Sequence, residues 1–174
     1  STGASYHHLL GVNTFDVAAT LIDGQSSKNQ NVSMQITPNP DPGSGDLIGD
    51  AVDLIFGGGA GDIYVLQLTY DEAGIPVGSN ESDLELGWFN EVTGEWESAV
   101  AGNSGGTPTF FNGAYSDYLG TLGGGVLDAG DLGVYGYDLF NNHVWASLDH
   151  ASLVGVGVFS SGTLAGDLDG DGFV

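Results

Sequence analysis

Through most of the chain, apolar residues recur at every second position, which is the pattern of strands with one buried face. Glycine, proline and asparagine separate these segments and mark the turns between them. The segments with this alternation are 12–22, 32–37, 63–70, 84–88, 109–111, 132–137, 143–148 and 153–159. We therefore expect an all-β fold, an antiparallel β-sandwich of jelly-roll or Greek-key type with about eight to ten strands and at most one short helix.

The connections between segments predict how some strands pair. A polar loop separates segments 12–22 and 32–37, so we expect these two to form a hairpin. The last three segments, 132–137, 143–148 and 153–159, follow one another across tight polar turns. This arrangement predicts an antiparallel meander of three strands.

Residues 46–56 fit two local structures. Asp46, Asp50 and Asp53 share one face at helical spacing, with apolar residues between them, which predicts a short amphipathic helix. A strand over 51–56 is the alternative. The three acids form either a solvated helix face or a cation site.

The three tryptophans lie on predicted strands. Segment 84–88 turns back at 90–94, so Trp88 and Trp96 are expected to face each other across a hairpin. Aromatic rings pack into protein cores and, where they are exposed, can stack on sugars. The candidate carbohydrate-binding residues are therefore Trp88, Trp96 and Trp145, with burial in the core as the alternative.

The charge of the chain limits its partners. The 174 residues include 23 acids and a single lysine or arginine, Lys28, which gives a formal net charge of −22. Phosphate groups are bound by lysine and arginine, so neither nucleic acid nor an anionic membrane surface is expected as a partner. No apolar run approaches the about 18 residues of a membrane span, so membrane insertion is not expected.

The end of the chain carries its most specific motif. Asp167, Asp169 and Asp171 alternate and Gly172 follows, as in the first half of an EF-hand calcium loop. Phe173 stands at the seventh position, which supplies a backbone carbonyl. The acidic ligand of position 12 would lie beyond residue 174, so we expect calcium binding once further chain or a partner supplies the missing ligands.

Catalytic chemistry has weak support in the sequence. No cysteine and no Gly-x-Ser-x-Gly motif occurs. His143 and His150, with Asp149 beside the second, flank one strand whose ends lie about 20 Å apart, too far to share a zinc ion. Adjacent His7 and His8 point to opposite faces of an extended chain, which disfavours a shared metal. A glycoside-acting enzyme needs two close carboxylates, for which the candidates near the tryptophans are Glu85, Glu95 and Glu97.

Four short motifs occur in order in the second half of the chain: Leu86-Gly-Trp-Phe, Thr93-Gly-Glu-Trp, Ala101-Gly-Asn-Ser-Gly-Gly106 and the run from Tyr135-Gly-Tyr-Asp to Asn141-Asn-His-Val-Trp-Ala-Ser-Leu-Asp-His150. With these motifs, residues 84–174 resemble a domain found near the C-terminus of large secreted proteins of planctomycete type. In those proteins the domain commonly precedes a sorting tail or a dockerin-like calcium repeat, and calcium repeats of the thrombospondin type share the same Asp-x-Asp-x-Asp-Gly pattern. The resemblance implies a secreted or cell-surface location and supplies no catalytic residues.

These observations predict four parts and a non-catalytic function. The parts are an N-terminal arm at 1–11, the sandwich at 12–160, a linker at 161–165 and a truncated dockerin-like segment at 166–174. We expect a structural or assembly module that associates, under the control of cations, with its own copies or with neighbouring surface modules. The alternatives are a carbohydrate-binding module, with a polysaccharide as partner, and a glycoside-acting enzyme.

Overall fold

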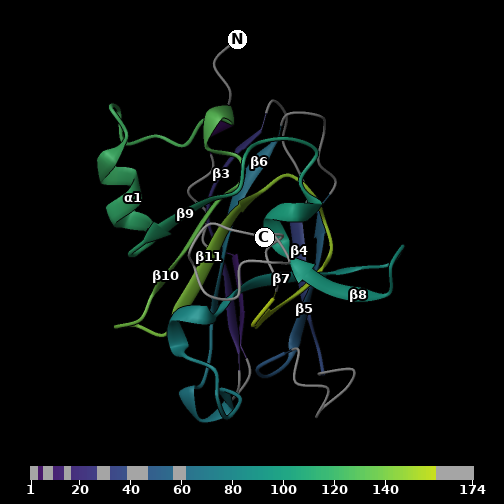
Figure 1. Ribbon diagram of the computed structural model, residues 1–174. Helices are drawn as coiled ribbons and strands as arrows, with labels where there is room; N and C mark the ends of the chain where they lie inside the picture. The colour runs from purple at the N-terminus through teal and green to yellow at the C-terminus, as the bar shows by residue number, and fades with distance from the viewer. Residues whose placement is uncertain are drawn as a thin grey trace, which may run out of the picture.

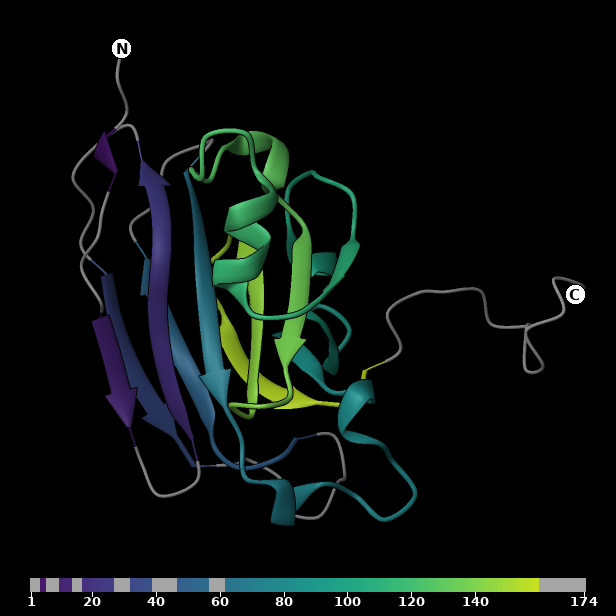
Figure 2. The ribbon, with the colours of Figure 1, turned by 90° about the vertical axis from the view of Figure 1, so that its left-hand side faces the viewer.

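Two β-sheets packed face to face form the body of the protein (Figures 1 and 2). The computed structural model describes residues 4–5, 10–13, 17–26, 32–38, 47–56 and 62–159. These ranges contain twelve strands, one α-helix and four short 3₁₀ helices. The expected all-β sandwich with one short helix is confirmed. The strand number exceeds the expected eight to ten because short strands extend the edges of the sheets.

The larger sheet, sheet A, has seven strands. Its order is β1-β3-β6-β11-β10-β9, and β2 pairs with β3 on the same side as β1. The pairs are antiparallel except for β9 and β10, which run parallel and make the sheet mixed. The strands are β1 Ala4–Ser5, β2 Leu10–Asn13, β3 Ala18–Ser26, β6 Ile63–Thr69, β9 Thr109–Asn112, β10 Val134–Asp138 and β11 His143–Leu148.

The smaller sheet, sheet B, is antiparallel throughout. Its order is β4-β5-β12-β7-β8, so β12 is the central strand. The edge strand β4 lies next to β2, which brings the two sheets together on one side of the sandwich. The strands are β4 Val32–Thr37, β5 Ala51–Phe56, β7 Glu85–Asn90, β8 Glu95–Ser98 and β12 Leu153–Gly157.

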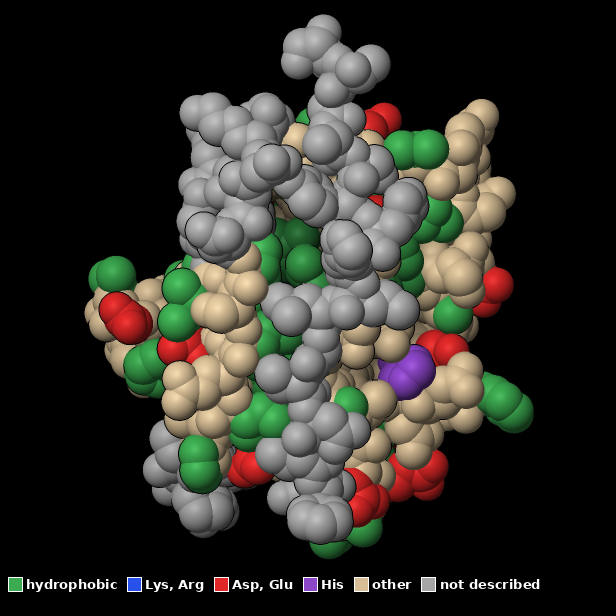
Figure 3. Space-filling model, turned by 180° about the vertical axis from the view of Figure 1, so that it is seen from behind, with side chains coloured by type: hydrophobic (Ala, Val, Ile, Leu, Met, Phe, Trp, Pro, Cys, Tyr) green, Lys and Arg blue, Asp and Glu red, His purple; other side chains and the backbone are tan. Residues whose placement is uncertain are grey.

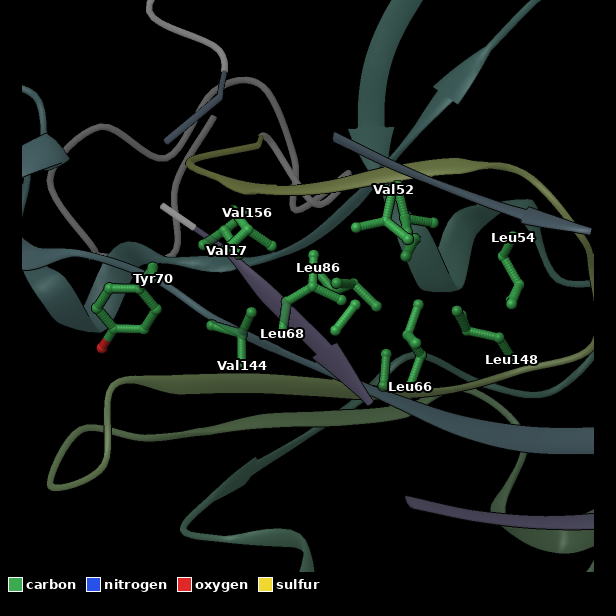
Figure 4. Close-up of a cluster of buried hydrophobic side chains, with 14 of the residues drawn as sticks. Val17, Val52, Leu54, Leu66, Leu68, Tyr70, Leu86, Val144, Leu148 and Val156 are labelled. Carbon is green, nitrogen blue, oxygen red and sulfur yellow. The ribbon is translucent and has the colours of Figure 1, made fainter. Parts of the chain in front are cut away.

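The main core lies between the sheets, as the alternation of apolar residues predicts (Figure 4). Leu66, Leu68 and Val144 point into it from sheet A. Their partners from sheet B include Val52 and Leu86. The other face of β6 is apolar in its first half, where Ile63 and Val65 are buried in a second core.

A second core covers the outer face of sheet A. The helix α1, Tyr115–Thr121, lies over this face together with residues 122–133 (Figure 2). A bulge between Leu21 and Asp23 turns Asp23 to the outer face, where its carboxylate accepts the Tyr115 hydroxyl at 2.7 Å. The 3₁₀ helices are η1 Glu72–Gly74, η2 Glu81–Asp83, η3 Ala99–Gly102 and η4 Ala129–Asp131.

Two glycines shape the outer face of sheet B. A Cβ at Gly87 would lie 2.2 Å from the Phe159 ring, and one at Gly155 would lie 2.7 Å from Leu47. Both neighbouring side chains therefore rest directly on the sheet backbone, where only glycine leaves room for them. Leu47 also forms a single bridge with Gly157.

The expected helix at 46–56 is wrong, and the alternative strand is confirmed as β5. Pairing with β4 and β12 stabilises the extended form, in which Val52 and Leu54 enter the main core. The helix occurs instead at α1, between the predicted strand segments 109–111 and 132–137. Tyr115, Tyr118 and Leu119 pack against the second core, and this tertiary contact outweighs weak local helix propensity.

Two predicted pairings are also wrong. The predicted strand 12–22 is not one strand: its start belongs to β2 and its end to β3. These two strands pair with each other, for example Val12 with Ala19. β3 and β4 belong to different sheets and form no hairpin. In the predicted meander, β10 and β11 pair as expected, but β12 crosses to sheet B. Strand β11 already has a partner on each side, β6 and β10, so sheet A leaves β12 no place beside it.

Candidate binding surfaces

The expected facing of two tryptophans across the β7–β8 hairpin is wrong. Trp88 pairs with Glu97, and Phe89 pairs with Trp96. Directly paired residues share a face and neighbours along a strand alternate, so the two tryptophans point to opposite faces of sheet B. Trp88 packs against the main core, whereas Trp96 lies on the outer face.

Trp145 belongs to the second core. Only 1% of its surface is exposed, and its indole N–H donates to the carbonyl of Gly113 at 2.9 Å. The rings of Phe111, Tyr115 and Tyr118 lie within 6.2 Å of it, measured between centroids. A sugar-stacking role does not fit this residue, because neighbouring rings surround its faces.

Trp88 and His150 form a packed pair at one end of the main core. Their ring centroids lie 5.1 Å apart in an edge-on arrangement. A Cβ at Gly102 would lie 2.8 Å from Trp88 and 2.9 Å from His150, so the η3 backbone closes over both rings. The indole N–H of Trp88 is buried and has no hydrogen-bond partner among the described residues.

The polar contacts of His150 hold the imidazole in one tautomer. Its Nε2 lies 2.9 Å from the carbonyl of Ala99, which only accepts, so Nε2 carries the proton. Its Nδ1 then accepts the Ser152 hydroxyl at 2.7 Å. Burial lowers the pKa of His150, which favours this neutral form.

Among the described residues, no catalytic triad is assembled around His150. The carboxylate of Asp149 accepts the backbone N–H of Ser104 at 3.0 Å and also contacts its hydroxyl. Asn103 donates to the Ser147 carbonyl and accepts the Asp149 N–H, which ties the 103–104 loop to the end of β11. The polar groups of this region therefore anchor a loop.

The three candidate glutamates are divided between the two faces of sheet B. Glu97 lies on the face of Trp88 and accepts bonds from Asn90 and Thr93 at 2.9 and 3.0 Å. Glu95 shares this face at an exposed position. Glu85 lies on the opposite face, where it accepts the Ser98 hydroxyl at 2.6 Å and is 7% exposed. Burial raises the pKa of Glu85 to about 7, but no second candidate carboxylate lies on its face.

The outer face of sheet B carries an aromatic row, which we define as Phe89, Trp96 and Phe159. Phe89 and Trp96 are 5.6 Å apart, and Trp96 and Phe159 are 6.3 Å apart in a stacked arrangement, measured between ring centroids. Phe89 and Trp96 are half-buried, whereas Phe159 is 8% exposed. Ile55 on the same sheet face is 55% exposed, so the accessible apolar part of this surface consists of Phe89, Trp96 and Ile55.

Sequence reasoning missed a second group of rings, the aromatic shelf, which we define as Phe110, Tyr135 and Tyr137. Phe110 pairs with Tyr135 between the parallel strands β9 and β10. Its ring centroid lies 5.7 Å from Tyr135 and 5.1 Å from Tyr137, and Phe110 is 48% exposed. The sequence shows Tyr135 and Tyr137 alternating on one predicted strand. It does not show that this strand pairs with β9, which brings Phe110 beside them.

The expected calcium loop and histidine pair fall outside the described residues, as does Asp46 of the predicted acidic face. These positions are Asp167, Asp169, Asp171 and Phe173 for calcium, with His7 and His8 at the other end. In the ranges that are described, no three His, Cys, Asp or Glu side chains are grouped so as to hold a metal ion. None of the helices there has the length and apolar character of a membrane crossing.

Comparison of the chain with family models, with curated proteins and with solved structures found no match.

Proposed function

We propose that this chain is a non-catalytic assembly module of a secreted or cell-surface protein, and that it associates with its own copies when divalent cations are present. The observation that supports this most is the aromatic row on the outer face of sheet B. Exposed apolar surfaces of this kind mark interaction sites in soluble proteins. Aromatic rings on a sheet face suit a contact with another protein surface.

The row fits a second copy of the chain because such a contact is self-complementary. In a two-fold dimer the same patch faces itself, so Trp96 and Ile55 of each copy would pack against the apolar surface of the other. Phe159 and Leu47 rest directly on the sheet backbone at Gly87 and Gly155, so these two side chains project little from the face. Two such faces can therefore approach closely.

Charge makes this association depend on cations. The described residues include no lysine or arginine, and acidic side chains are spread over the surface (Figure 3). Asp53 lies on the outer face of sheet B, and Glu91 and Glu95 are exposed on the hairpin that carries Trp96. Two copies in contact would bring like charges together, and divalent ions that bridge carboxylates would relieve the repulsion.

The secreted or cell-surface location rests on the resemblance of residues 84–174 and on the calcium-loop pattern of Asp167, Asp169 and Asp171. Calcium sites of extracellular modules have dissociation constants on the order of 10⁻⁴–10⁻³ M. Calcium at such concentrations would serve both the loop, once it is completed by further chain, and the bridging of carboxylates.

Sedimentation velocity tests the proposal with calcium, with chelator, and with sodium chloride at matched ionic strength. We expect dimers or larger species with calcium and monomers with chelator. Trp96→Ala and Ile55→Ser should each weaken the calcium-dependent association. Phe140→Ala is the control, because Phe140 is 94% exposed on the β10–β11 turn, away from the row. A chain that stays monomeric at high concentration in all three solutions would refute the assembly function.

A further inference from the structure

We infer that the aromatic shelf of Phe110, Tyr135 and Tyr137 is a binding site for a neutral polysaccharide chain. The shelf lies on sheet A, whereas the aromatic row lies on sheet B. The inference therefore stands independently of the proposed assembly function.

The register of β9 and β10 builds the shelf from one face of two parallel strands. Phe110 pairs with Tyr135, and Asn112 pairs with Tyr137. Paired residues share a face, so two tyrosines, a phenylalanine and a carboxamide lie together. Asn112 is exposed, and Phe110 lies within 5.7 Å of both tyrosine rings, measured between centroids.

The position of the shelf keeps it accessible. Strand β9 is the last strand of sheet A, and no described strand pairs with its other side. Tyr135 and Tyr137 are half-buried and contact the main core with part of their surface. The core contact fixes the rings from below, so the shelf is rigid before any ligand arrives.

The chemistry of these side chains matches a sugar. A pyranose ring presents apolar C–H groups on its faces and hydroxyls at its rim. The C–H groups can stack on Phe110 and the tyrosine rings, while the carboxamide of Asn112 can both donate to and accept from hydroxyls. Tyr135 and Tyr137 are two residues apart on a strand, or about 6.6 Å, so successive sugars of one chain can each meet a ring.

Charge and strand length select among possible occupants. The described residues carry no lysine or arginine to pair with uronic acids, sulfates or phosphates, and the net charge of −22 repels such groups, so a neutral polysaccharide is favoured. A protein strand added to β9 is disfavoured, because β9 has only four residues, 109–112, with Pro108 before it and Gly113 after it.

Affinity electrophoresis tests the inference with soluble neutral polysaccharides, namely β-glucan, xylan, mannan and xyloglucan, and pull-down tests it with insoluble cellulose and chitin. We expect retention by at least one of these polymers. Phe110→Ala and Tyr137→Ala should each weaken retention by about five- to tenfold, as expected for the loss of one stacked ring. Asn112→Ala should weaken it by a smaller factor.

Phe140→Ala is the matched control, since it also removes an exposed phenylalanine but lies outside the shelf. Circular dichroism and the unfolding midpoint confirm that each variant is folded. Failure of the unmodified chain to bind any of the polymers would overturn the inference, and so would equal retention of Phe110→Ala and the unmodified chain. A loss of self-association in Phe110→Ala without any effect on retention would assign the shelf to a protein partner instead.

Discussion

Glu85→Gln should make the protein more stable at alkaline pH, because it removes a buried group that resists ionisation. Glu85 lies on the outer face of sheet B, beside Gly157 in the register, and accepts the Ser98 hydroxyl. Burial raises the pKa of its carboxyl from 4.5 to about 7 in the folded protein, and the Ser98 bond offsets only part of this shift. The folded state therefore holds a proton that the unfolded state releases. Stability from this group is complete below pH 4.5 and is lost as the pH rises through 7.

The size of the effect follows from the two pKa values. A difference of one unit corresponds to about 1.4 kcal/mol. A rise from 4.5 to about 7 thus lowers the free energy of unfolding at high pH by about 3 kcal/mol. The loss is about 1 kcal/mol at pH 5 and nearly complete at pH 8. A glutamine has the shape of the protonated acid and can still accept the Ser98 hydroxyl, but it does not ionise.

Urea unfolding followed by tryptophan fluorescence measures this difference at pH 5, 6, 7 and 8. Ionic strength is held constant, because the net charge of −22 makes every stability value sensitive to salt. The advantage of Glu85→Gln over the unmodified chain should grow by about 2 kcal/mol between pH 5 and pH 8. Glu95→Gln is the control, since it removes the same charge from an exposed position. An advantage that does not change with pH would show that burial leaves the ionisation of Glu85 unperturbed, and the reasoning would fail.

Two further changes test the packing around the cores. Gly102→Ala places a methyl group against the rings of Trp88 and His150, so it should lower the free energy of unfolding by about 1–3 kcal/mol. Gly105→Ala is the control, because its methyl group would meet nothing within 4 Å. Equal thermal unfolding midpoints of the two variants would contradict the close approach of the Gly102 backbone to the two rings. Tyr115→Phe removes the hydroxyl that Asp23 accepts and should lower stability by about 1–3 kcal/mol in urea unfolding. An unchanged midpoint would show that this bond does not hold α1 on sheet A.

The sequence predicted strands well and sheets poorly, for a physical reason. Alternation reports whether one face of a strand is buried, and that property is the same in either sheet of a sandwich. The residues of β12 alternate correctly whether the strand follows β11 in sheet A or crosses to sheet B. Its true place depends on which partner edges are already occupied. That information belongs to the whole fold and is not contained in any short window.

The tryptophans illustrate the same limit at the level of a single residue. Trp88 and Trp96 stand on a hairpin whose existence was predicted, but their faces depend on the register of the turn. The pairing of Asn90 with Glu95 sets that register, and a shift by one residue would exchange the two faces of β8. The sequence therefore predicted that aromatic residues lie on this hairpin, but it could not predict which of the two tryptophans lies on the outer face.

The aromatic shelf was harder to predict than the aromatic row. Tyr135 and Tyr137 alternate within one predicted strand, but their neighbour Phe110 comes from β9, which runs parallel to β10. The helices α1 and η4 lie between these two strands in the sequence, so Phe110 is far along the chain from the tyrosines that it contacts. Parallel neighbours need long connections, and local patterns do not identify them.

The placement of Phe159 has a mechanical consequence. Residue 159 lies two residues after β12, which is at the centre of sheet B with β5 on one side and β7 on the other. A pulling force applied at this residue is transmitted first to the stacked ring above Gly87 and then to a strand that is hydrogen-bonded along both sides. Detaching that strand requires two ladders to break, whereas an edge strand such as β8 or β4 would peel away from a single neighbour. A force applied at Phe159 therefore meets more resistance than the same force applied to an edge strand of sheet B.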